Sequence, residues 1–199
     1  MRQGQGKSRG RVPGIWLMTD ERMAPGDLSR AVARLPRGSA VVLRHYGLAP
    51  ADRQALFVQV GRTARRRGLG LLLAGDAALA RAWRADGHHG PGCRPVGTGP
   101  ARTRWLHSAP VHDVRQLRAA VRAGADAVLV SPLFATRSHP GAKPLGSARF
   151  AALARLSPVP VIALGGVKPR HAGLIRRLGA AGFAAIDGLV PRRRGDRVT

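Results

Sequence analysis

Groups that could bind phosphate stand out in the second half of the chain. Gly165 and Gly166 follow the apolar run VPVIAL (159–164) and shortly precede a helical pattern. The bare backbone N–H groups of a Gly-Gly turn and a helix N-terminus can together hold an anion. The alternative is a strand-to-helix turn that needs glycine only for its dihedral angles. The pair therefore predicts a phosphate site, with a structural turn as the competing interpretation.

A second candidate is the loop SPLFATRSHPGAKPLG (131–146), which is longer than most connections between a strand and a helix. Its polar and charged side chains are Thr136, Arg137, Ser138, His139 and Lys143. Hydroxyls, cations and a titratable ring suit a loop that closes over a phosphorylated substrate and excludes water. A surface insertion without function is the alternative.

A candidate metal ligand is Asp76, which follows the apolar run LLLAG. Mg²⁺ prefers oxygen ligands that it shares with substrate phosphates, so a carboxylate at a strand end could hold it. The same aspartate could instead cap the next helix. His88, His89 and His112 have no ligand-like spacing, so the sequence does not predict a zinc site.

The elements that must position these groups alternate regularly between strand and helix. Predicted strands cover 15–19, 40–44, 70–74, 86–90, 104–108, 125–130, 159–164 and 183–186. Predicted helices cover 27–35, with Asp27 as its cap, and 50–67, 76–84, 112–123, 147–156 and 169–178. Runs that are apolar on both faces suit a parallel sheet covered by helices.

Eight such units predict an α/β fold, a compact (β/α)₈ TIM barrel whose last helix is short or missing. An open doubly wound sheet is the alternative, although no G-x-G-x-x-G follows the first strand. We expect one domain over 14–190, a disordered basic tail over 1–13 and a basic tail over 191–199. In a barrel the site lies at the carboxyl ends of the strands, which selects Arg44 and places His112 in the same region.

The composition excludes several classes of protein. The chain has 199 residues, 34 Lys+Arg against 10 Asp+Glu, a net charge of +24 and one cysteine. A single cysteine excludes an internal disulfide, and the absence of an apolar run of about 18 residues excludes a membrane span. We expect a cytoplasmic protein. Because no nucleic-acid-binding motif accompanies the charge, compositional bias is the favoured explanation and a polyanion-binding surface the alternative.

Several segments together resemble the thiamine phosphate synthase family, which includes the thiazole tautomerases. GADAVLVSPLFATRSHPGAKPLG (124–146) is similar to the family's sixth strand and phosphate loop, and PVIALGGV (160–167) to its glycine phosphate site. IWLMTDERM (15–23), VVLRHYG (41–47) and VHDVRQLRAAVRAGAD (111–126) also resemble family segments. The resemblance covers about residues 14–190.

The resemblance implies an enzyme that joins hydroxymethylpyrimidine diphosphate to thiazole phosphate and releases pyrophosphate, with Mg²⁺ assisting. It implies that Arg44 contacts pyrophosphate, Asp76 holds Mg²⁺ and His112 occupies the position of the tautomerase proton shuttle. It further implies phosphate contacts from the strand-6 loop and the glycine pair: Thr136, Ser138, His139, Gly165 and Gly166. Phosphorylated small molecules are the expected substrates, and a small homo-oligomer is the expected assembly.

The chain also departs from the family pattern at several site positions. Val42 and Tyr46 replace a glutamine and a lysine of the second strand, and Asp187 replaces a small serine-type residue after the last strand. The fourth strand is followed by no carboxylate where the family has a second metal ligand. These departures keep two alternatives open: an isomerase like the thiazole tautomerases, and a degenerate barrel that binds a phosphometabolite or polyanion.

Overall fold

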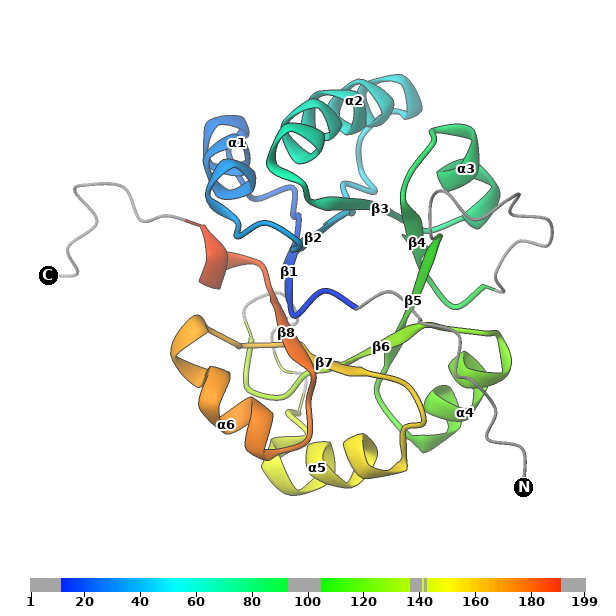
Figure 1. Ribbon diagram of the computed structural model, residues 1–199, viewed down its shortest axis with the longest axis vertical. Coiled ribbons are helices and arrows are strands. Elements are labelled where there is room, and N and C mark those ends of the chain that lie inside the picture. The colour runs from blue at the N-terminus through cyan, green and yellow to red at the C-terminus, as the bar shows by residue number, and fades with distance from the viewer. Residues whose placement is uncertain (1–11, 93–104, 137–140, 142, 191–199) are drawn as a thin grey trace, which may run out of the picture.

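In the computed structural model, eight parallel strands close into a barrel in chain order, with β1 beside β8 (Figure 1). The structure describes residues 12–92, 105–136, 141 and 143–190. The strands are β1 (Ile15–Met18), β2 (Ala40–Leu43), β3 (Gly70–Ala74), β4 (Gly87–His89), β5 (Leu106–Val111), β6 (Ala127–Val130), β7 (Val161–Ala163) and β8 (Gly182–Ala185). This closed sheet confirms the TIM barrel and excludes the open-sheet alternative.

In the described part of the chain, six helices surround the barrel (Figure 1). They are α1 (Pro25–Arg34), α2 (Pro50–Arg67), α3 (Ala77–Ala82), α4 (Val114–Arg122), α5 (Gly146–Leu156) and α6 (Ala172–Arg177), with 3-10 turns η1 (Pro169–His171) and η2 (Asp187–Leu189). After β8 the described residues contain only η2, as expected for a short last helix. The predicted tails fall on residues 1–13 and 191–199, of which 1–11 and 191–199 lie outside the described part of the chain. None of the described helices combines the length and the apolarity that a membrane span needs.

Each strand buries both of its faces, because alternate side chains point to opposite sides of a sheet. One set fills the barrel interior: Trp16, Met18, Ala40, Val42, Leu72, Ala74, Leu129, Ile162 and Ala184. The intervening residues, such as Leu17, Val41 and Val128, pack beneath the helices. The strand register therefore decides which residue at each strand end points into the barrel.

Two predicted boundaries in the region of His112 were wrong. The fifth strand runs to Val111 rather than Ser108, because Pro110 pairs in register with Leu129 and does not interrupt the strand. The next helix begins at Val114 rather than at 112, because the Asp113 side chain caps it by accepting a hydrogen bond from Gln116 N at 2.7 Å. His112 consequently lies between strand and helix, at the carboxyl end of the barrel.

The predicted cap of the first helix was also wrong. The helix begins at Pro25 with Ala24 as its N-cap, and Asp27 lies in the first turn, where it forms an ion pair with Arg30. Proline is favoured at the first helical position because its missing N–H would have no partner there. Asp27 still stabilises the helix, through its charge near the positive end of the dipole.

Histidines of β4 and β5 are buried within the wall of the barrel rather than at its mouth. His88 stacks on His107 with ring centroids 4.3 Å apart, and both rings lie on the helix side of the wall. His89 is in register with Ala74 and Ser108, so it points into the barrel, where its Nδ1 lies 3.0 Å from Ser108 Oγ. Burial, followed by the charge of Arg44, lowers the pKa of His89 from 6.5 to about 3.

This lowered pKa predicts a specific pH dependence of stability. The unfolded chain binds a proton at His89 near its ordinary pKa, whereas the folded chain does so only near pH 3. Stability is therefore complete above about pH 6.5 and falls as the pH drops, by about 1 kcal/mol per pH unit. We expect His89→Asn, whose amide preserves a donor toward Ser108, to show a correspondingly shallower decline in denaturant titrations between about pH 6 and 4. Equal slopes for the two proteins would contradict the assignment.

Candidate active site

The main pocket opens at the carboxyl ends of the strands and has a volume of about 310 Å³. Arg44, Ser131, Leu164 and Ile186 line it, each two residues beyond an inward-pointing residue of its strand. The remaining lining residues come from the ends of β5 to β8 and the loops that follow: His112, Pro132, Ala135, Thr136, Gly165, Gly166, Val167, Ala184, Ala185, Asp187 and Gly188. The pocket is thus the continuation of the barrel interior beyond its apolar layers.

Arg44 is held in place by the end of the first strand. Its Nε donates to Thr19 O at 2.7 Å, and its terminal nitrogen donates to Asp20 at 2.6 Å. The Arg44 backbone N–H donates to Thr19 Oγ1 at 3.0 Å, and the Arg53 side chain donates to Arg44 O at 2.8 Å. These contacts fix a guanidinium at the pocket, where it can pair with a phosphate through its remaining N–H groups.

The carboxylate of Asp20 balances much of this charge. It contacts both Arg22 and Arg44, at 2.6 Å each. The hydrogen bond from Arg22 is the largest influence that lowers the pKa of Asp20, and the charge of Arg44 adds to it against the opposing effect of burial. Asp20 therefore stays ionised at neutral pH and orients Arg44.

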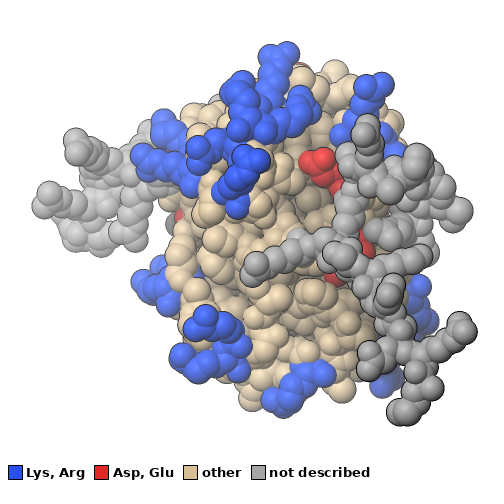
Figure 2. Space-filling view, in the orientation of Figure 1, with Lys and Arg blue, Asp and Glu red and all other residues tan. Residues whose placement is uncertain are grey.

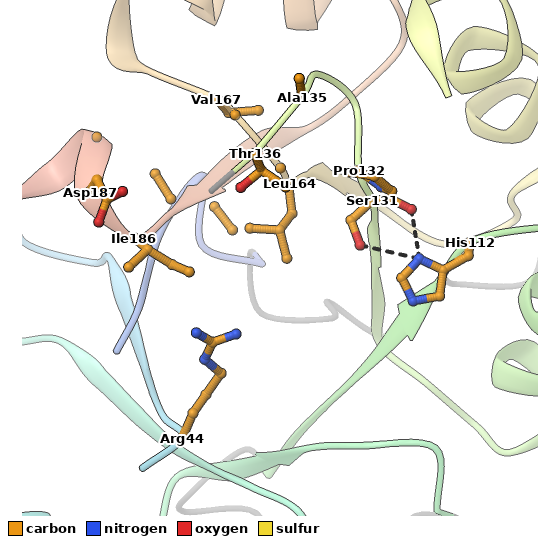
Figure 3. Close-up of a pocket in the computed structure, with 15 residues that line it drawn as sticks. Arg44, His112, Ser131, Pro132, Ala135, Thr136, Leu164, Val167, Ile186 and Asp187 are labelled. Carbon is orange, nitrogen blue, oxygen red and sulfur yellow. Dashed lines mark hydrogen bonds between the residues drawn. The ribbon is translucent and has the colours of Figure 1, made fainter. Parts of the chain in front are cut away.

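His112 and Ser131 lie on another side of the same pocket (Figure 3). The Nδ1 of His112 is 2.7 Å from Ser131 O. Since a carbonyl oxygen only accepts, Nδ1 carries the proton in the neutral ring, and Nε2 holds the lone pair. The His112 backbone N–H donates to Gln116 Oε1 at 2.8 Å, which ties the histidine to the first turn of α4. His112 is therefore an oriented base with its accepting nitrogen at Nε2.

Gly165 and Gly166 follow β7 and bring bare backbone to the pocket. Both adopt the left-handed conformation, with φ of +91° and +63°. A Cβ at Gly165 would lie 2.6 Å from Pro132 Cα, and one at Gly166 would lie 2.4 Å from Ala135 O. The two glycines are thus required by the fold, for dihedral angles and for close packing against the strand-6 loop. Because neither glycine has a side chain, their side of the pocket stays open to a bound group.

Asp187 and Thr136 also line this pocket (Figure 3). The Asp187 carboxylate is exposed and contributes to the raised pKa of Arg22, whose main cause is the hydrogen bond to Asp20. Among the pocket residues that the structure describes, Arg44 and Asp187 carry formal charges of opposite sign. The described lining is therefore close to neutral, although it can offer hydrogen bonds to an anion.

The structure gathers five of the predicted site residues at one pocket and separates others from it. Those at the pocket are Arg44, His112, Thr136, Gly165 and Gly166. Ser138 and His139 lie outside the described residues. Lys143 is described and exposed, but it is not part of the lining.

Asp76 acts as the helix cap that the sequence offered as its alternative role. Its Oδ1 accepts from Leu79 N at 2.8 Å at the start of α3, and the residue is exposed. It does not line the pocket. Within the described part of the chain, no group of three or more His, Cys, Asp or Glu residues could hold a metal.

Three lining residues, Ser131, Leu164 and Ile186, were missed as site residues in the sequence. Each directly follows the last residue of an observed strand. The rule that places the site of a barrel at the carboxyl ends of its strands, which selected Arg44, therefore applies to them too. Leu164 and Ile186 were counted as ends of strands. Their place in the pocket depends on the alternation of inward and outward residues, which the register fixes only once the barrel is closed.

The fold and this pocket define a TIM-barrel protein with a pocket at the carboxyl ends of its strands. A family model described as thiamine monophosphate synthase matches residues 15–189. The chain therefore belongs to the thiamine monophosphate synthase family, as the sequence motifs predict.

Individual relatives support the same assignment. A thiamine-phosphate synthase of Chloroflexus aurantiacus is 29% identical over 182 residues, covering 88% of this chain and 84% of the relative. One from a Roseiflexus species is 33% identical over 187 residues, covering 88% and 78%. In structure, a thiamine phosphate pyrophosphorylase of Pyrococcus furiosus superposes with a TM-score of 0.72 at 20% identity, covering 88% of this chain and 86% of that one.

The glycine pair gives a prediction that separates crowding from backbone strain. Gly38 and Gly166 both have positive φ, of +80° and +63°, but a Cβ at Gly38 would meet nothing within 4 Å. We expect Gly38→Ala to lower the free energy of unfolding by about 1–2 kcal/mol, the cost of the left-handed conformation. Gly166→Ala should lower it by about 2 kcal/mol more, because the new methyl overlaps Ala135 O. Equal losses in denaturant titrations would show that Gly166 is not closely packed.

Proposed function

We propose that this protein joins hydroxymethylpyrimidine diphosphate to thiazole phosphate and releases pyrophosphate, which makes it a transferase of thiamine biosynthesis. The observation that carries the proposal is a single pocket that combines Arg44, Thr136 and the Gly165–Gly166 backbone in a chain of this family. The C–O bond to the diphosphate breaks, and the thiazole nitrogen forms the new C–N bond. Because the leaving group takes the electron pair, the main requirement is compensation of its negative charge.

Several pocket residues have a role in this proposal. Arg44, oriented by Thr19 and Asp20, binds the diphosphate and compensates the charge that grows on the leaving pyrophosphate. The backbone of Gly165 and Gly166 and the Thr136 hydroxyl bind the thiazole phosphate. The apolar lining of Leu164, Val167 and Ile186 excludes water from the pyrimidine cation. Ser138 and His139 remain proposed phosphate contacts of the loop.

The described residues offer few ligands for Mg²⁺, so they fit the ion only if most of its ligands come from the substrate. Mg²⁺ commonly uses one or two carboxylates together with substrate phosphates and water. Asp76 is the carboxylate we propose for it, since only its Oδ1 has a partner among the contacts of the described residues. When bound, Mg²⁺ would further neutralise the diphosphate. We also propose a cytoplasmic location, since multiply charged phosphate esters do not cross an apolar bilayer unaided.

The geometry of His112 favours a second candidate, an isomerase like the thiazole tautomerases. Its Nδ1–H is fixed on Ser131 O, so Nε2 is available to move a proton at the pocket. That reaction needs one phosphate site and a base but no pair of metal-binding carboxylates.

Pyrophosphate release from the two substrates distinguishes these candidates. We expect release that requires both substrates and Mg²⁺, and we expect Arg44→Gln to lower kcat/KM about 100-fold, because a charge-assisted contact to the leaving group is lost. Arg62→Gln on the exposed surface of α2 is the matched control and should leave the rate unchanged. Metal-independent thiazole isomerisation that His112→Ala abolishes, without any pyrophosphate release, would replace the synthase with the tautomerase.

Asp187 gives a prediction about substrate affinity. Its carboxylate lines the pocket near the proposed site of the thiazole phosphate, so like charges weaken binding. We expect Asp187→Ser to lower the KM for thiazole phosphate about three- to tenfold, with a smaller effect at high salt, where the repulsion is screened. Asp52→Ser in the first turn of α2 removes the same charge away from the pocket and should have little effect. An unchanged or raised KM in Asp187→Ser would place the phosphate elsewhere.

A further inference from the structure

Half of the basic residues in the described segments lie at the end of the barrel opposite the pocket, where few acidic residues accompany them. Helices of the barrel run antiparallel to the strands, so their last turns lie at the amino ends of the strands. Each of the six helices has arginine in its last turn, and further arginines follow in the loops. The exposed arginines of this amino-terminal face are Arg34, Arg37, Arg65, Arg66, Arg67, Arg81, Arg84, Arg122, Arg155, Arg176 and Arg177.

Figures 1 and 2 view this face directly. In Figure 1 the strands follow one another clockwise from β1 to β8. Because the connections between parallel strands are right-handed, this order means that the amino ends of the strands point toward the viewer. Figure 2 shows several separate groups of basic side chains along the visible edge of this face. Few acidic side chains are visible between them.

The acidic residues are distributed in the opposite way. Most of those in the described segments follow a strand or begin a helix at the pocket end: Asp20, Glu21, Asp27, Asp52, Asp76, Asp113 and Asp187. The two at the amino-terminal face accept hydrogen bonds from backbone, Asp86 from Leu71 N at 2.8 Å and Asp126 from His107 N at 2.9 Å. The ion pairs found among the described residues involve Asp20 and Asp27, which lie at the pocket end. The described acidic residues therefore balance only a small part of the positive charge of the exposed arginines named above, which we call the arginine rim.

The rim suits a long, regularly charged anion better than a small one. Its arginines are spread around the circumference of the barrel, and a duplex presents one negative charge per about 1.7 Å along its axis. Of the large apolar side chains that are strongly exposed in the described segments, Leu156 lies at this end, whereas the aromatic Tyr46 lies at the other. Among the described residues of this face no aromatic side chain is strongly exposed, so the face lacks the stacking platform that single strands use, and one leucine is a weak anchor for a bilayer.

We propose that the amino-terminal face binds the phosphate backbone of a nucleic-acid duplex without reading its sequence. Arginine can contact phosphate through paired N–H groups, and the released counterions favour binding. The site lies at the far end of the barrel from the pocket, so the bound duplex leaves the pocket open. The sequence favoured compositional bias as the explanation of the charge; this inference adopts the alternative, a polyanion-binding surface.

Fluorescence anisotropy of a labelled DNA duplex of about 20 base pairs tests the proposal. Three triple variants of the full chain remove the same charge from different places. The face variant replaces Arg65, Arg122 and Arg155 with glutamine, the pocket-end control replaces Arg115, Arg149 and Arg170, and the C-terminal control replaces Arg192, Arg193 and Arg194. The first two sets are exposed and share helices α4 and α5. Circular dichroism verifies that each variant is folded.

The wild-type protein should bind the duplex with an affinity that falls steeply between about 50 and 200 mM salt. The face variant should lose at least about tenfold in affinity and reduce the slope of log K against log salt by about 0.9 per lost contact. Each control should change affinity by less than about threefold. The proposal is overturned if the three variants lose affinity equally, if the C-terminal control loses most, or if the duplex does not bind while vesicles of anionic lipid do.

Discussion

The alternation of side chains along a closed parallel barrel is the constraint on which the site depends. Each strand that directs Val42, Leu129, Ile162 or Ala184 into the interior must direct the residue two positions later into the same space. Those later residues are Arg44, Ser131, Leu164 and Ile186, and all four line the pocket. The apolar layers beneath therefore position the pocket residues above. A shift of one residue in the register of a strand would turn its pocket residue into the helix layer.

At the pocket end, hydrogen bonds and ion pairs fix the orientation of the charged side chains. Arg44 is oriented by Thr19 and Asp20, and Asp20 is shared with Arg22. The opposite charge of Asp187 leaves the described lining close to neutral. Under the proposed function, phosphate binding in this pocket depends on directed hydrogen bonds from Arg44, Thr136 and the Gly165–Gly166 backbone more than on an excess of positive charge. Among the described residues, the excess of basic over acidic side chains is greater at the other end of the barrel, where it cannot serve the reaction.

Much of the fold was predictable because strand and helix signals were strong and alternated regularly. The bounds 50–67 and 70–74 match the structure, since a proline begins the helix, a left-handed glycine ends it and an apolar run follows. The fifth strand was predicted poorly because Pro110 reads locally as an interruption. Only pairing with Leu129 shows that its missing N–H is tolerated there. The starts of α1 and α4 depended on which of several adjacent residues forms the cap.

The site was predictable to the extent that it depends on strand ends. Arg44, Gly165 and Gly166 lie at or just after the ends of clear strands, and His112 was selected by its place after the fifth strand and by the family resemblance. Asp76 looked equally suited to a metal and to a helix cap, and only the contact with Leu79 N identified the cap. The uneven distribution of arginine was invisible in the sequence, because last-turn residues of six separate helices are scattered along the chain. The closed barrel brings them to one face.

The central claim is that the pocket between Arg44 and Gly166 binds a phosphorylated azole. Calorimetric titration of the full chain with thiamine phosphate, and separately with thiamine, tests this claim most directly. The account predicts saturable binding of one thiamine phosphate per chain, at least about tenfold tighter than thiamine, because the phosphate gains charge-assisted and backbone hydrogen bonds. Equal affinity for the two compounds, or no saturable binding of either, would contradict it.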